Sequence, residues 1–436
     1  MSTIAYLAIQ FPSAVEPYVT AEIEELRSRG VQVIPGSVRK ATSRDGIHQE
    51  SGLETVVLQP LRVITLMRAL WLCIRHWDRI ADLIRRILLR GRESPMQRIK
   101  ALAHTWLGAC YALLLEGRGV EHIHAHHGYF GSWIAMAAAR FLDVSFSMTL
   151  HGSDLLLHGT YLDAKLENCR FCLTVSEYNR RYILQQYPAV EAKKVVVSRL
   201  GVCLPECRGL PGLARRIGTD KPSFDLSVLA VGRLHAVKDH AFLVRACAQL
   251  RACGLKVDCL IAGEGSERSN LESLIRKYGL RERVRLLGHV SNEQTDSLYA
   301  RADVVVLTSR SEGIPLVLME AMASGKLVLA PEITGIPELV IAGKTGFLYK
   351  PGSLADFVAR LLFIHSLLHA HQRPDQSPHI LSAAKQLDWI RHGARVQVRH
   401  NFNRTQNLES FGNVFIQRTV PQGRRFRDED LVLQQI

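Results

Sequence analysis

Short apolar runs alternate with longer amphipathic stretches along most of the chain, a pattern typical of strands that are each followed by a helix. The strands predicted in the first half lie at residues 4–9, 31–34, 120–125, 146–150 and 170–175. Those predicted in the second half lie at residues 226–231, 255–262, 284–287, 304–308 and 327–329. Repeated strand–helix units predict an α/β protein whose parallel sheets carry helices on both faces.

A stretch without clear periodicity separates the two halves. Residues 203–222 are rich in proline, glycine and charge, which is typical of a linker. We therefore predict two Rossmann-like, doubly wound domains that face each other across a cleft, over residues 1–205 and 206–385. Residues 386–415 are predicted to form helices, and residues 416–436 a polar tail.

Composition fits a globular protein. Of the 436 residues, 47% are hydrophobic and 22% charged. No uncharged apolar run approaches the roughly 18 residues of a transmembrane helix. The first residues also lack the basic start and long apolar stretch of a secretory signal.

Cysteine usage favours a reducing compartment, because the nine cysteines are scattered and odd in number. We therefore expect a cytoplasmic protein. The pairs Cys169–Cys172 and Cys203–Cys207 have the spacing of metal ligands. The first pair straddles the start of a predicted strand and the second brackets a proline, so a zinc site is disfavoured.

Basic residues outnumber acidic ones, 55 to 41, and they concentrate in residues 62–100, which hold ten Lys and Arg against three acids. Trp71, Trp77 and Ile80 accompany them. The arginines expected loosely on one helical side are Arg68, Arg75, Arg79, Arg86 and Arg90. Such a segment is either a basic amphipathic helix that associates with an anionic membrane or a solvated helix packed on its own domain. Nucleic acid is disfavoured, since no compact basic motif with exposed aromatics on strands occurs.

Glycine-containing turns follow several predicted strands of the second half. In VGRLHAVKD (231–239), Gly232 permits close approach of a diphosphate, and Arg233 and Lys238 can supply the positive charges that such a group requires. Gly263 and Gly265 form a GEG turn after the next strand. The turn at 288–290, with Gly288 and Val290, can leave backbone groups free to pair with a base edge.

Two carboxylates in SEGIPLVLMEAMASGK are the most informative pair in the chain. Glu312 is predicted in a loop and Glu320 in the helix that follows, at the carboxyl end of a strand, where open α/β sheets bind nucleotides. One carboxylate can accept hydrogen bonds from ribose and the other can reach a sugar ring. The helix start that follows Gly313, Ile314 and Pro315 points backbone N–H groups at the cleft and forms an anion site. The alternative is a helix with an acidic first turn and one solvated glutamate.

Histidines cluster after two strands of the first half. His124, His126 and His127 lie in HIHAHHGYFGSW (122–133), and His151 and Asp154 lie in TLHGSDLLL (149–157). The first three have the appearance of a metal cluster, but they equally suit the acceptor side of a cleft or the end of a strand. His151 is either functional or a structural histidine beside a helix start.

Together these motifs resemble the retaining glycosyltransferases of family 4 (group 1), and especially the subset that builds bacterial exopolysaccharides of the colanic-acid type. TGIPELVIAGKTGFLYKPGS (334–353) and FPSAVEPYVTAEIEELRSRG (11–30) add to the resemblance, which covers about residues 1–415. It implies the GT-B fold, with an acceptor-side N-terminal domain, a nucleotide-sugar domain and last helices that cross back to the N-terminal domain. Residues 14–18 read Ala-Val-Glu-Pro-Tyr, whereas that subset usually has Ser-Glu-Thr-Phe.

The resemblance also implies residue roles. Arg233 and Lys238 would bind the donor diphosphate, Glu320 the ribose, Glu312 and the backbone after it the donor sugar, and His151 the transferred sugar. The implied reaction moves a hexosyl unit from a nucleotide-diphosphate sugar to a hydroxyl of a lipid-linked or polysaccharide acceptor with retention, by front-face attack, and without cofactor or metal. His126, His127 and Asp154 would lie on the acceptor side. A sugar-nucleotide epimerase and a non-catalytic partner with the same fold are the alternatives.

Overall fold

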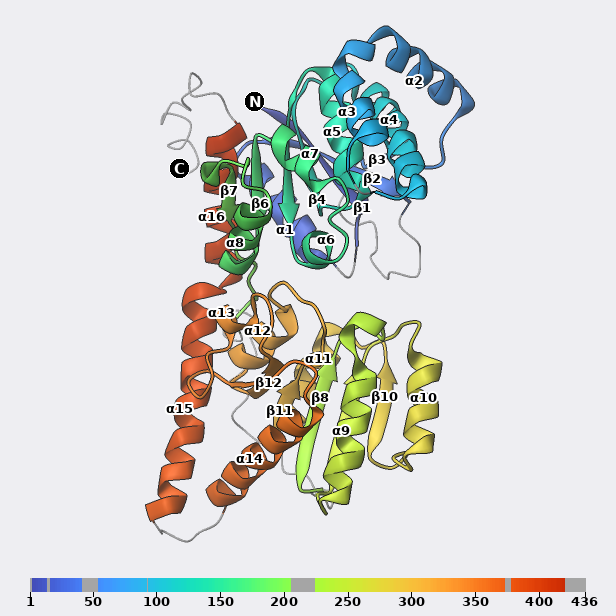
Figure 1. Ribbon diagram of the computed structural model, residues 1–436. Helices are drawn as coiled ribbons and strands as arrows, with labels where there is room; N and C mark the ends of the chain where they lie inside the picture. Colours follow the sequence, from blue (N-terminus) through green and yellow to red (C-terminus); the bar gives the residue numbers. More distant parts are fainter. Residues whose placement is uncertain are drawn as a thin grey trace, which may run out of the picture. The chain divides into compact units, whose positions relative to one another are not determined.

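The computed structural model describes residues 2–13, 16–40, 54–91, 93–204, 224–372 and 378–419 (Figure 1). The chain divides into two compact units. Unit 1 comprises Met1–Val175, Arg180–Ser198 and Leu408–Ile436, and unit 2 comprises Ser176–Asn179 and Arg199–Asn407. Most of the predicted linker, residues 205–222, lies outside the described residues, as do residues 14 and 15 of the first loop.

Unit 1 is built on seven parallel strands in the order β3-β2-β1-β4-β5-β6-β7. The strands are β1 (Thr3–Gln10), β2 (Gln32–Arg39), β3 (Val56–Val57), β4 (Val120–His126), β5 (Ser145–Leu150), β6 (Phe171–Thr174) and β7 (Val195–Val197). The first strand lies inside the sheet and the chain winds outwards from it in both directions. This is the predicted doubly wound order, and its switch point lies between β1 and β4.

The helices of unit 1 cover both faces of this sheet. They are α1 (Pro17–Ser28), α2 (Val63–Arg75), α3 (Ala81–Leu89), α4 (Pro95–Leu115), α5 (Phe130–Leu142), α6 (Ser153–Leu156), α7 (Leu162–Asn168), α8 (Glu177–Gln186) and α16 (Arg404–Thr419), with short 3-10 turns η2 (Trp77–Arg79) and η3 (Ala192–Lys194). The unit boundary falls within α8 and again within α16. Residues 416–419 complete α16, so this part of the predicted polar tail is helical, and residues 420–436 lie outside the described part.

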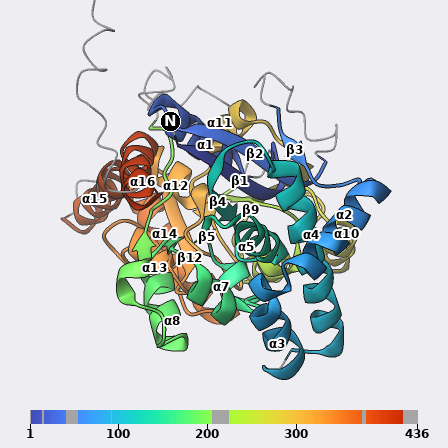
Figure 2. The ribbon, with the colours of Figure 1, turned by 90° about the horizontal axis from the view of Figure 1, so that it is seen from above.

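The side chains of β1 point alternately to the two faces of the sheet, and a separate core covers each face. Ala5 and Leu7 join one buried cluster together with α4 and α5, which pack side by side (Figure 2). Ile4 and Tyr6 point to the other face and join a cluster with α1 and α16. Successive side chains of a strand point to opposite faces, so a strand that is apolar throughout requires cover on both sides.

The basic segment 62–100 differs from the prediction of one helical side. It comprises α2, η2, α3 and the start of α4, because α2 ends at Arg75, α3 ends at Leu89 and α4 begins at Pro95. Three of the predicted surface arginines are engaged with the protein, and one of them, Arg68, lies 3.5 Å from Glu116 at the surface. Arg79 donates to the carbonyl of Phe141 at 2.8 Å, and Arg86 donates to the carboxylates of Glu93 and Asp163, each at 2.8 Å.

Unit 2 repeats the same architecture with six parallel strands in the order β10-β9-β8-β11-β12-β13. They are β8 (Leu226–Val231), β9 (Val257–Ala262), β10 (Val284–Gly288), β11 (Val304–Val306), β12 (Leu327–Pro331) and β13 (Phe347–Tyr349). β13 was not predicted. The switch point lies between β8 and β11, and the turns predicted to carry the chemistry follow β8 to β11.

Helices also cover both faces of this second sheet. They are α9 (His240–Ala252), α10 (Arg268–Lys277), α11 (Asn292–Arg301), α12 (Leu316–Ala323), α13 (Ile336–Leu339), α14 (Leu354–Gln372) and α15 (Pro378–Asn401), with the 3-10 turn η5 (Ala236–Lys238). Val228 and Val304 point into a core with α9, α10 and α14. Leu229 and Val305 point into the opposite core with α12 and α15. No helix among the described residues has the length and apolar composition to cross a membrane.

Candidate functional site

Two groups of predicted residues lie at the switch points of the two sheets, one group in each unit. In unit 2, Lys238 ends η5 after β8, and Glu312 lies in the loop after β11. The Nζ of Lys238 is 2.5 Å from Oε1 of Glu312, and both side chains are largely buried. Because β8 and β11 are neighbours, residues 74 positions apart form this ion pair at the carboxyl ends of the strands.

Hydrogen bonds to backbone carbonyls hold the loops after β8 and β11 together. The hydroxyl of Thr308 donates to the carbonyl of Lys238 at 2.9 Å, and the N–H of Arg310 donates to the carbonyl of Val237 at 2.8 Å. The stem of Lys238 lies against Gly232, where an added Cβ would be 3.8 Å from its Cδ. Arg233, the next residue, is exposed. Two cationic side chains thus follow one strand, one fixed by Glu312 and one open to solvent.

The predicted glycines let neighbouring turns approach one another. A Cβ at Gly263 would lie 2.0 Å from the carbonyl oxygen of Gly232, and one at Gly265 would lie 2.3 Å from that of Leu234. The N–H of Gly263 in turn donates to the carbonyl of Gly288 at 2.8 Å. These contacts require residues without a side chain, so the GEG turn links the turns after β8, β9 and β10.

Glu320 lies inside α12 and Glu312 in the preceding loop, as predicted. The hydroxyl of Tyr299, a fully buried side chain of α11, donates to Oε2 of Glu320 at 2.9 Å. The loop around Gly313 is fixed as well, since the hydroxyl of Thr334 donates to the carbonyl of Glu312 at 2.7 Å. Tyr299 was not predicted, because a tyrosine on an amphipathic helix gives no signal of the carboxylate that it meets.

In unit 1, the residues after β1, β4 and β5 form one polar cluster. Nε2 of His127 is 2.9 Å from Glu16, and Nδ1 of His127 is 3.5 Å from Asp154. His127 has a φ of 73°, a left-handed conformation that is uncommon outside glycine and frequent at functional sites. Asp154 accepts hydrogen bonds from the N–H groups of Gly128 and Gly152, each at 2.8 Å, and so fixes the loops after β4 and β5.

Burial and charge set the protonation of this cluster. Burial alone would lower the pKa of His127, but its hydrogen bonds to Asp154 and Glu16 raise that pKa to about 9. Burial opposes ionisation of Asp154, yet the hydrogen bond from His127 holds the pKa of that carboxyl well below its usual range. Burial and the charge of His127 lower the pKa of His126 to about 3 and hold that of His151 well below its usual value. At neutral pH, His127 is therefore a cation while His126 and His151 are neutral.

A chain of hydrogen bonds runs from His151 into the core. Nε2 of His151 is 2.7 Å from Nε2 of His126, Nδ1 of His126 is 3.0 Å from the hydroxyl of Tyr6, and that hydroxyl is bonded to Glu22. If Tyr6 donates to the Glu22 carboxylate, His126 must donate to Tyr6 and accept from His151. The Nδ1 of His151 is then left as an acceptor. Burial raises the pKa of Glu22 to about 7, which places the far end of this chain near its titration point.

The predicted group of His124, His126 and His127 does not form one cluster in the structure. His124 is fully buried and hydrogen-bonds to Ser147 and Thr149, with its ring 5.0 Å from that of Phe415, so it belongs to the core. His126, His127 and His151 instead present ring nitrogens within 4.8 Å of one another. These three could hold a transition-metal ion. In the structure His126 is hydrogen-bonded to His151, and His127 is hydrogen-bonded to Glu16 and lies 3.5 Å from Asp154.

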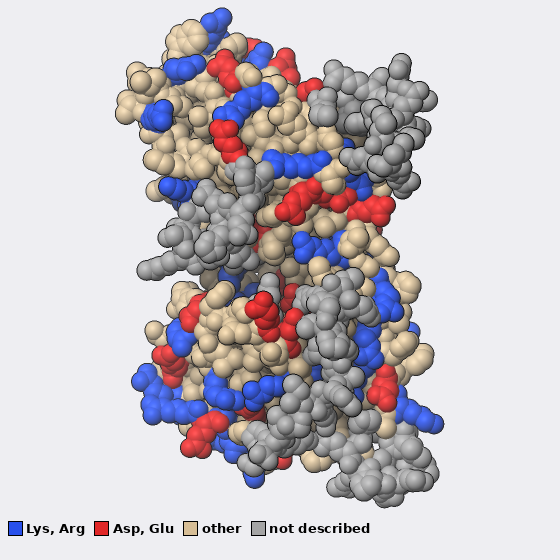
Figure 3. Space-filling model, turned by 180° about the vertical axis from the view of Figure 1, so that it is seen from behind, with Lys and Arg blue, Asp and Glu red and all other residues tan. Residues whose placement is uncertain are grey.

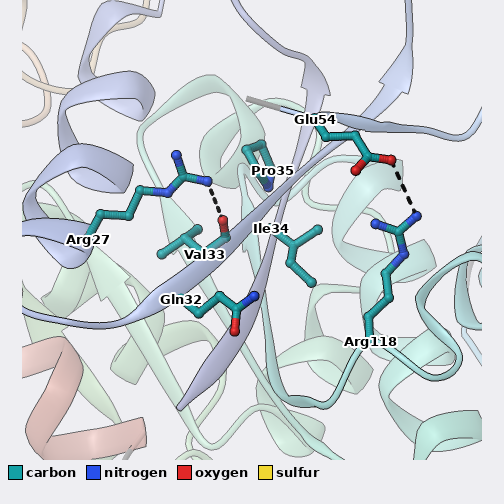
Figure 4. Close-up of a pocket in the computed structure, with 7 residues that line it drawn as sticks. All are labelled: Arg27, Gln32, Val33, Ile34, Pro35, Glu54 and Arg118. Carbon is teal, nitrogen blue, oxygen red and sulfur yellow. Dashed lines mark hydrogen bonds and ion pairs between the residues drawn. The ribbon is translucent and has the colours of Figure 1, made fainter. Parts of the chain in front are cut away.

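A surface pocket of about 470 Å³ lies elsewhere in unit 1 (Figure 4). Arg27 and Arg118 stand at opposite sides of it, and Arg118 lies 3.8 Å from Glu54. Arg27 donates to the carbonyl of Val33 at 2.5 Å. None of the predicted site residues lines this pocket. The two clusters at the switch points therefore remain the candidate site.

The second half of the chain carries the clearest similarity to known proteins. Residues 216–374 match the family described as glycosyl transferases group 1. The chain resembles the group 1 glycosyltransferases. An α-D-kanosaminyltransferase of Streptomyces kanamyceticus is 37% identical over 138 residues, covering 31% of this chain and 36% of the relative. The amylovoran biosynthesis glycosyltransferase AmsK of Erwinia amylovora is 30% identical over 213 residues, covering 43% of this chain and 52% of the relative. The matches thus span about a third to a half of these relatives' length, and the predicted resemblance is confirmed.

Solved structures match nearly the whole chain. The sucrose-phosphate synthase of Thermosynechococcus elongatus superposes with a TM-score of 0.67 at 18% identity, over 96% of this chain and 99% of the other. HepE of Anabaena, solved in complex with UDP, gives a TM-score of 0.64 at 18% identity, over 96% of this chain and 100% of the other. Such likeness concerns the fold, and it confirms the predicted GT-B class of two Rossmann-like parallel-sheet domains.

Proposed function

We propose that this chain is a retaining glycosyltransferase. It transfers a hexosyl unit from a nucleotide-diphosphate sugar to a hydroxyl of a lipid-linked or polysaccharide acceptor in bacterial exopolysaccharide biosynthesis. Unit 2 binds the donor, and the His126–His127–His151 cluster of unit 1 contacts the acceptor and the transferred sugar. The observation that carries the proposal is the Lys238–Glu312 pair at the β8/β11 switch point, within the residues that match the family.

Donor binding would rearrange this pair. The diphosphate would lie at Gly232 between Arg233 and Lys238, so that Lys238 gains a second anionic neighbour. Glu312 would then be free to accept hydrogen bonds from the sugar hydroxyls, and Glu320, held by Tyr299, would accept those of the ribose. Two cations and the first N–H groups of α12 would stabilise the charge that grows on the leaving diphosphate, so we propose that the reaction needs no metal.

Retention is proposed to follow from front-face attack. The bond between the anomeric carbon and the diphosphate oxygen breaks while the bond to the acceptor oxygen forms on the same face. The acceptor proton passes to the leaving diphosphate. No carboxylate is assigned as a nucleophile, and Glu312 acts by positioning the sugar. His151 is proposed to contact the transferred sugar, while His126 holds its Nε2.

The acceptor class suggests where the reaction takes place. A lipid-linked acceptor is embedded in a membrane, and its sugar is reached from the membrane surface. We propose that the protein acts in the cytoplasm, at the inner face of the cytoplasmic membrane, as a peripheral protein. The basic segment 62–100, in unit 1, is the part of the chain suited to such contact.

The test is transfer of radiolabelled hexose from UDP-, GDP- and ADP-sugars to a lipid extract from an exopolysaccharide-producing bacterium. We expect label in the lipid fraction from one donor. Glu312→Ala should lower turnover by about 100-fold or more through lost sugar positioning, while binding of the free nucleotide changes little. Glu272→Ala, an exposed glutamate of the same unit, is the control. Near-normal turnover in Glu312→Ala would show that this assignment is wrong.

A further inference from the structure

Helix α2 is apolar on two opposite faces. One face, with Leu66, Ala69, Leu72 and Cys73, packs on the core of unit 1 and against α4. The other face is exposed to solvent; Ile64 is 74% exposed and Trp71 57%. Its large apolar residues are Val63, Ile64, Met67, Leu70, Trp71 and Ile74. A helix that is apolar all round normally lies in a protein core or in a membrane, and no residue that the structure describes buries this face.

The exposed residues form one continuous stripe. At 3.6 residues per turn they occupy an arc of about 120° around the helix axis. Arg68 and Arg75 fall just beyond one border of that arc and are themselves exposed. The guanidinium of Arg75 lies 4.9 Å from the ring centre of Trp71. An apolar stripe with tryptophan and arginine at its border is typical of helices that lie in a membrane interface.

The end of α3 and the start of α4 add a second exposed apolar group. Leu89 is 79% exposed, and Leu88, Met96 and Ile99 are exposed as well. Arg98 joins these two helix ends, because its guanidinium donates to the carbonyls of Ile87 and Leu88 at 2.5 and 2.6 Å. We call the ten residues the α2–α4 apolar surface: Val63, Ile64, Met67, Leu70, Trp71, Ile74, Leu88, Leu89, Met96 and Ile99.

The charge around this surface is positive. α2 contains no acidic residue. Two of the three acids of residues 62–100 are neutralised within the protein, Asp82 by Arg140 at 2.5 Å and Glu93 by Arg86 at 2.8 Å. The third acid, Asp78, is exposed. The exposed basic residues of the segment include Arg62, Arg75, Arg85, Arg90 and Lys100, and the exposed Arg68 lies 3.5 Å from Glu116. Seen from behind, unit 1 shows broad areas without charge that are interrupted by separate Lys and Arg side chains and by several Asp and Glu side chains (Figure 3).

We propose that the α2–α4 apolar surface inserts into the headgroup region of an anionic lipid bilayer. The stripe of α2 enters the boundary of the acyl chains, and the arginines at its border bind lipid phosphates. A second copy of the chain fits the same surface less well, because an antiparallel two-fold contact between the stripes would set the arginines of one α2 beside those of the other. The proposal names the membrane partner of the proposed function and rests on that function for its biological role, but binding requires neither donor nor acceptor.

The test is sedimentation of the full chain with vesicles of phosphatidylcholine, with and without phosphatidylglycerol, at about 0.15 M and about 0.5 M salt. We expect binding to the anionic vesicles that is weakened but not abolished by the higher salt, because apolar insertion is insensitive to screening. Trp71→Ser together with Ile74→Ser should lower the partition coefficient by about tenfold or more. Arg68→Gln together with Arg75→Gln should lower it severalfold and reduce its salt dependence.

Matched controls come from unit 2. Trp389→Ser removes a tryptophan from α15 that is more exposed (67%) than Trp71, and Arg276→Gln with Lys277→Gln removes two exposed charges from the end of α10. Neither should change vesicle binding. Nucleotide binding and thermal unfolding, measured on every variant, verify folding and report on the donor site separately. The proposal would be overturned if the wild-type chain did not bind anionic vesicles, or if the Trp71/Ile74 variant bound them as strongly as wild type does. A dimer that the same variant converts to monomer would also overturn it, since a second copy would then cover the surface.

Discussion

At the scale of single residues, the two clusters serve different purposes. The Lys238–Glu312 pair joins a charge for the diphosphate to a carboxylate for the sugar, and both side chains are largely buried but not fully enclosed. The cluster of unit 1 is mostly buried and holds its charges in fixed places: a cationic His127 between two carboxylates, and neutral His126 and His151 in a hydrogen-bonded chain. Burial makes such a network sensitive to any change in its members.

Glu22 offers a test of that network through pH. Burial raises its pKa to about 7 in the folded protein, whereas a glutamate in the unfolded chain titrates near about 4.3. Between these values the folded state binds more protons than the unfolded state, so this residue lowers the free energy of unfolding as pH rises through the window. Glu22→Gln abolishes this titration. We expect its stability relative to wild type to rise by up to about 3 kcal/mol between about pH 5 and pH 8 in urea unfolding.

The control for this measurement is Glu24→Gln, which changes an exposed glutamate of the same helix α1. Its stability difference from wild type should be the same at every pH. If the difference for Glu22→Gln is equally flat, Glu22 does not titrate near neutrality, and the buried chain to His151 is not arranged as described.

The chemical identity of the site residues could be read from the sequence, but their partners could not. Lys238, Glu312 and Glu320 stand out because they follow predicted strands in recurrent motifs. Tyr6 and Glu22 give no such signal, since a strand tyrosine and a helix glutamate are ordinary residues. Their bonds join positions that are up to 120 residues apart, and only the winding of the sheet brings them together.

At the scale of elements, the donor half depends on three turns that touch. The turn after β9 is held against the turn after β8 at a distance that leaves no room for a side chain at Gly263. Gly263→Ala should therefore push the two turns apart, lower the free energy of unfolding by about 2–3 kcal/mol and weaken nucleotide binding. Urea unfolding and calorimetric titration of the nucleotide measure the two effects.

Gly254→Ala is the matched control. Gly254 also has a left-handed backbone, with a φ of 83°, but an added Cβ would meet nothing within 4 Å. It should cost about 1 kcal/mol from backbone conformation alone and leave nucleotide binding unchanged. Equal effects of the two substitutions on binding would mean that the contact between the turns does not shape the donor site.

Long apolar strands were predicted well and short elements were missed. β8 has the predicted bounds, and α12 contains Glu320 as predicted, because each element has a clear period and a clear end. β3, β7 and β13 are two or three residues long, too short for any periodicity to be visible. In residues 62–100 the mixed apolar and basic pattern suggested one helical side, but the breaks at 76–80 and 90–94 separate α2, α3 and α4.

At the scale of the whole molecule, the same winding occurs twice, and each switch point carries one polar cluster. The repeat of strand and helix made this architecture predictable, since parallel strands require crossovers and cover on both faces. The sequence did not show to which unit each of the last helices belongs. In the structure α15 belongs to unit 2, and α16 is divided between the units at Leu408. Apolar periodicity shows that a helix has a buried face but not which core receives it.

The central claim is that unit 2 binds a nucleotide diphosphate through Arg233 and Lys238 without a metal ion. The most direct measurement is calorimetric titration of UDP, GDP and ADP into the full chain, each with and without EDTA. Wild type, Arg233→Ala, Lys238→Ala and the control Arg276→Ala, an exposed arginine of the same unit, are compared. We predict a Kd on the order of micromolar for one nucleotide, unchanged by EDTA and by Arg276→Ala, and weakened by about tenfold to 100-fold in Arg233→Ala and Lys238→Ala. Failure of all three nucleotides to bind, binding that EDTA abolishes, or full affinity in Arg233→Ala would contradict the claim.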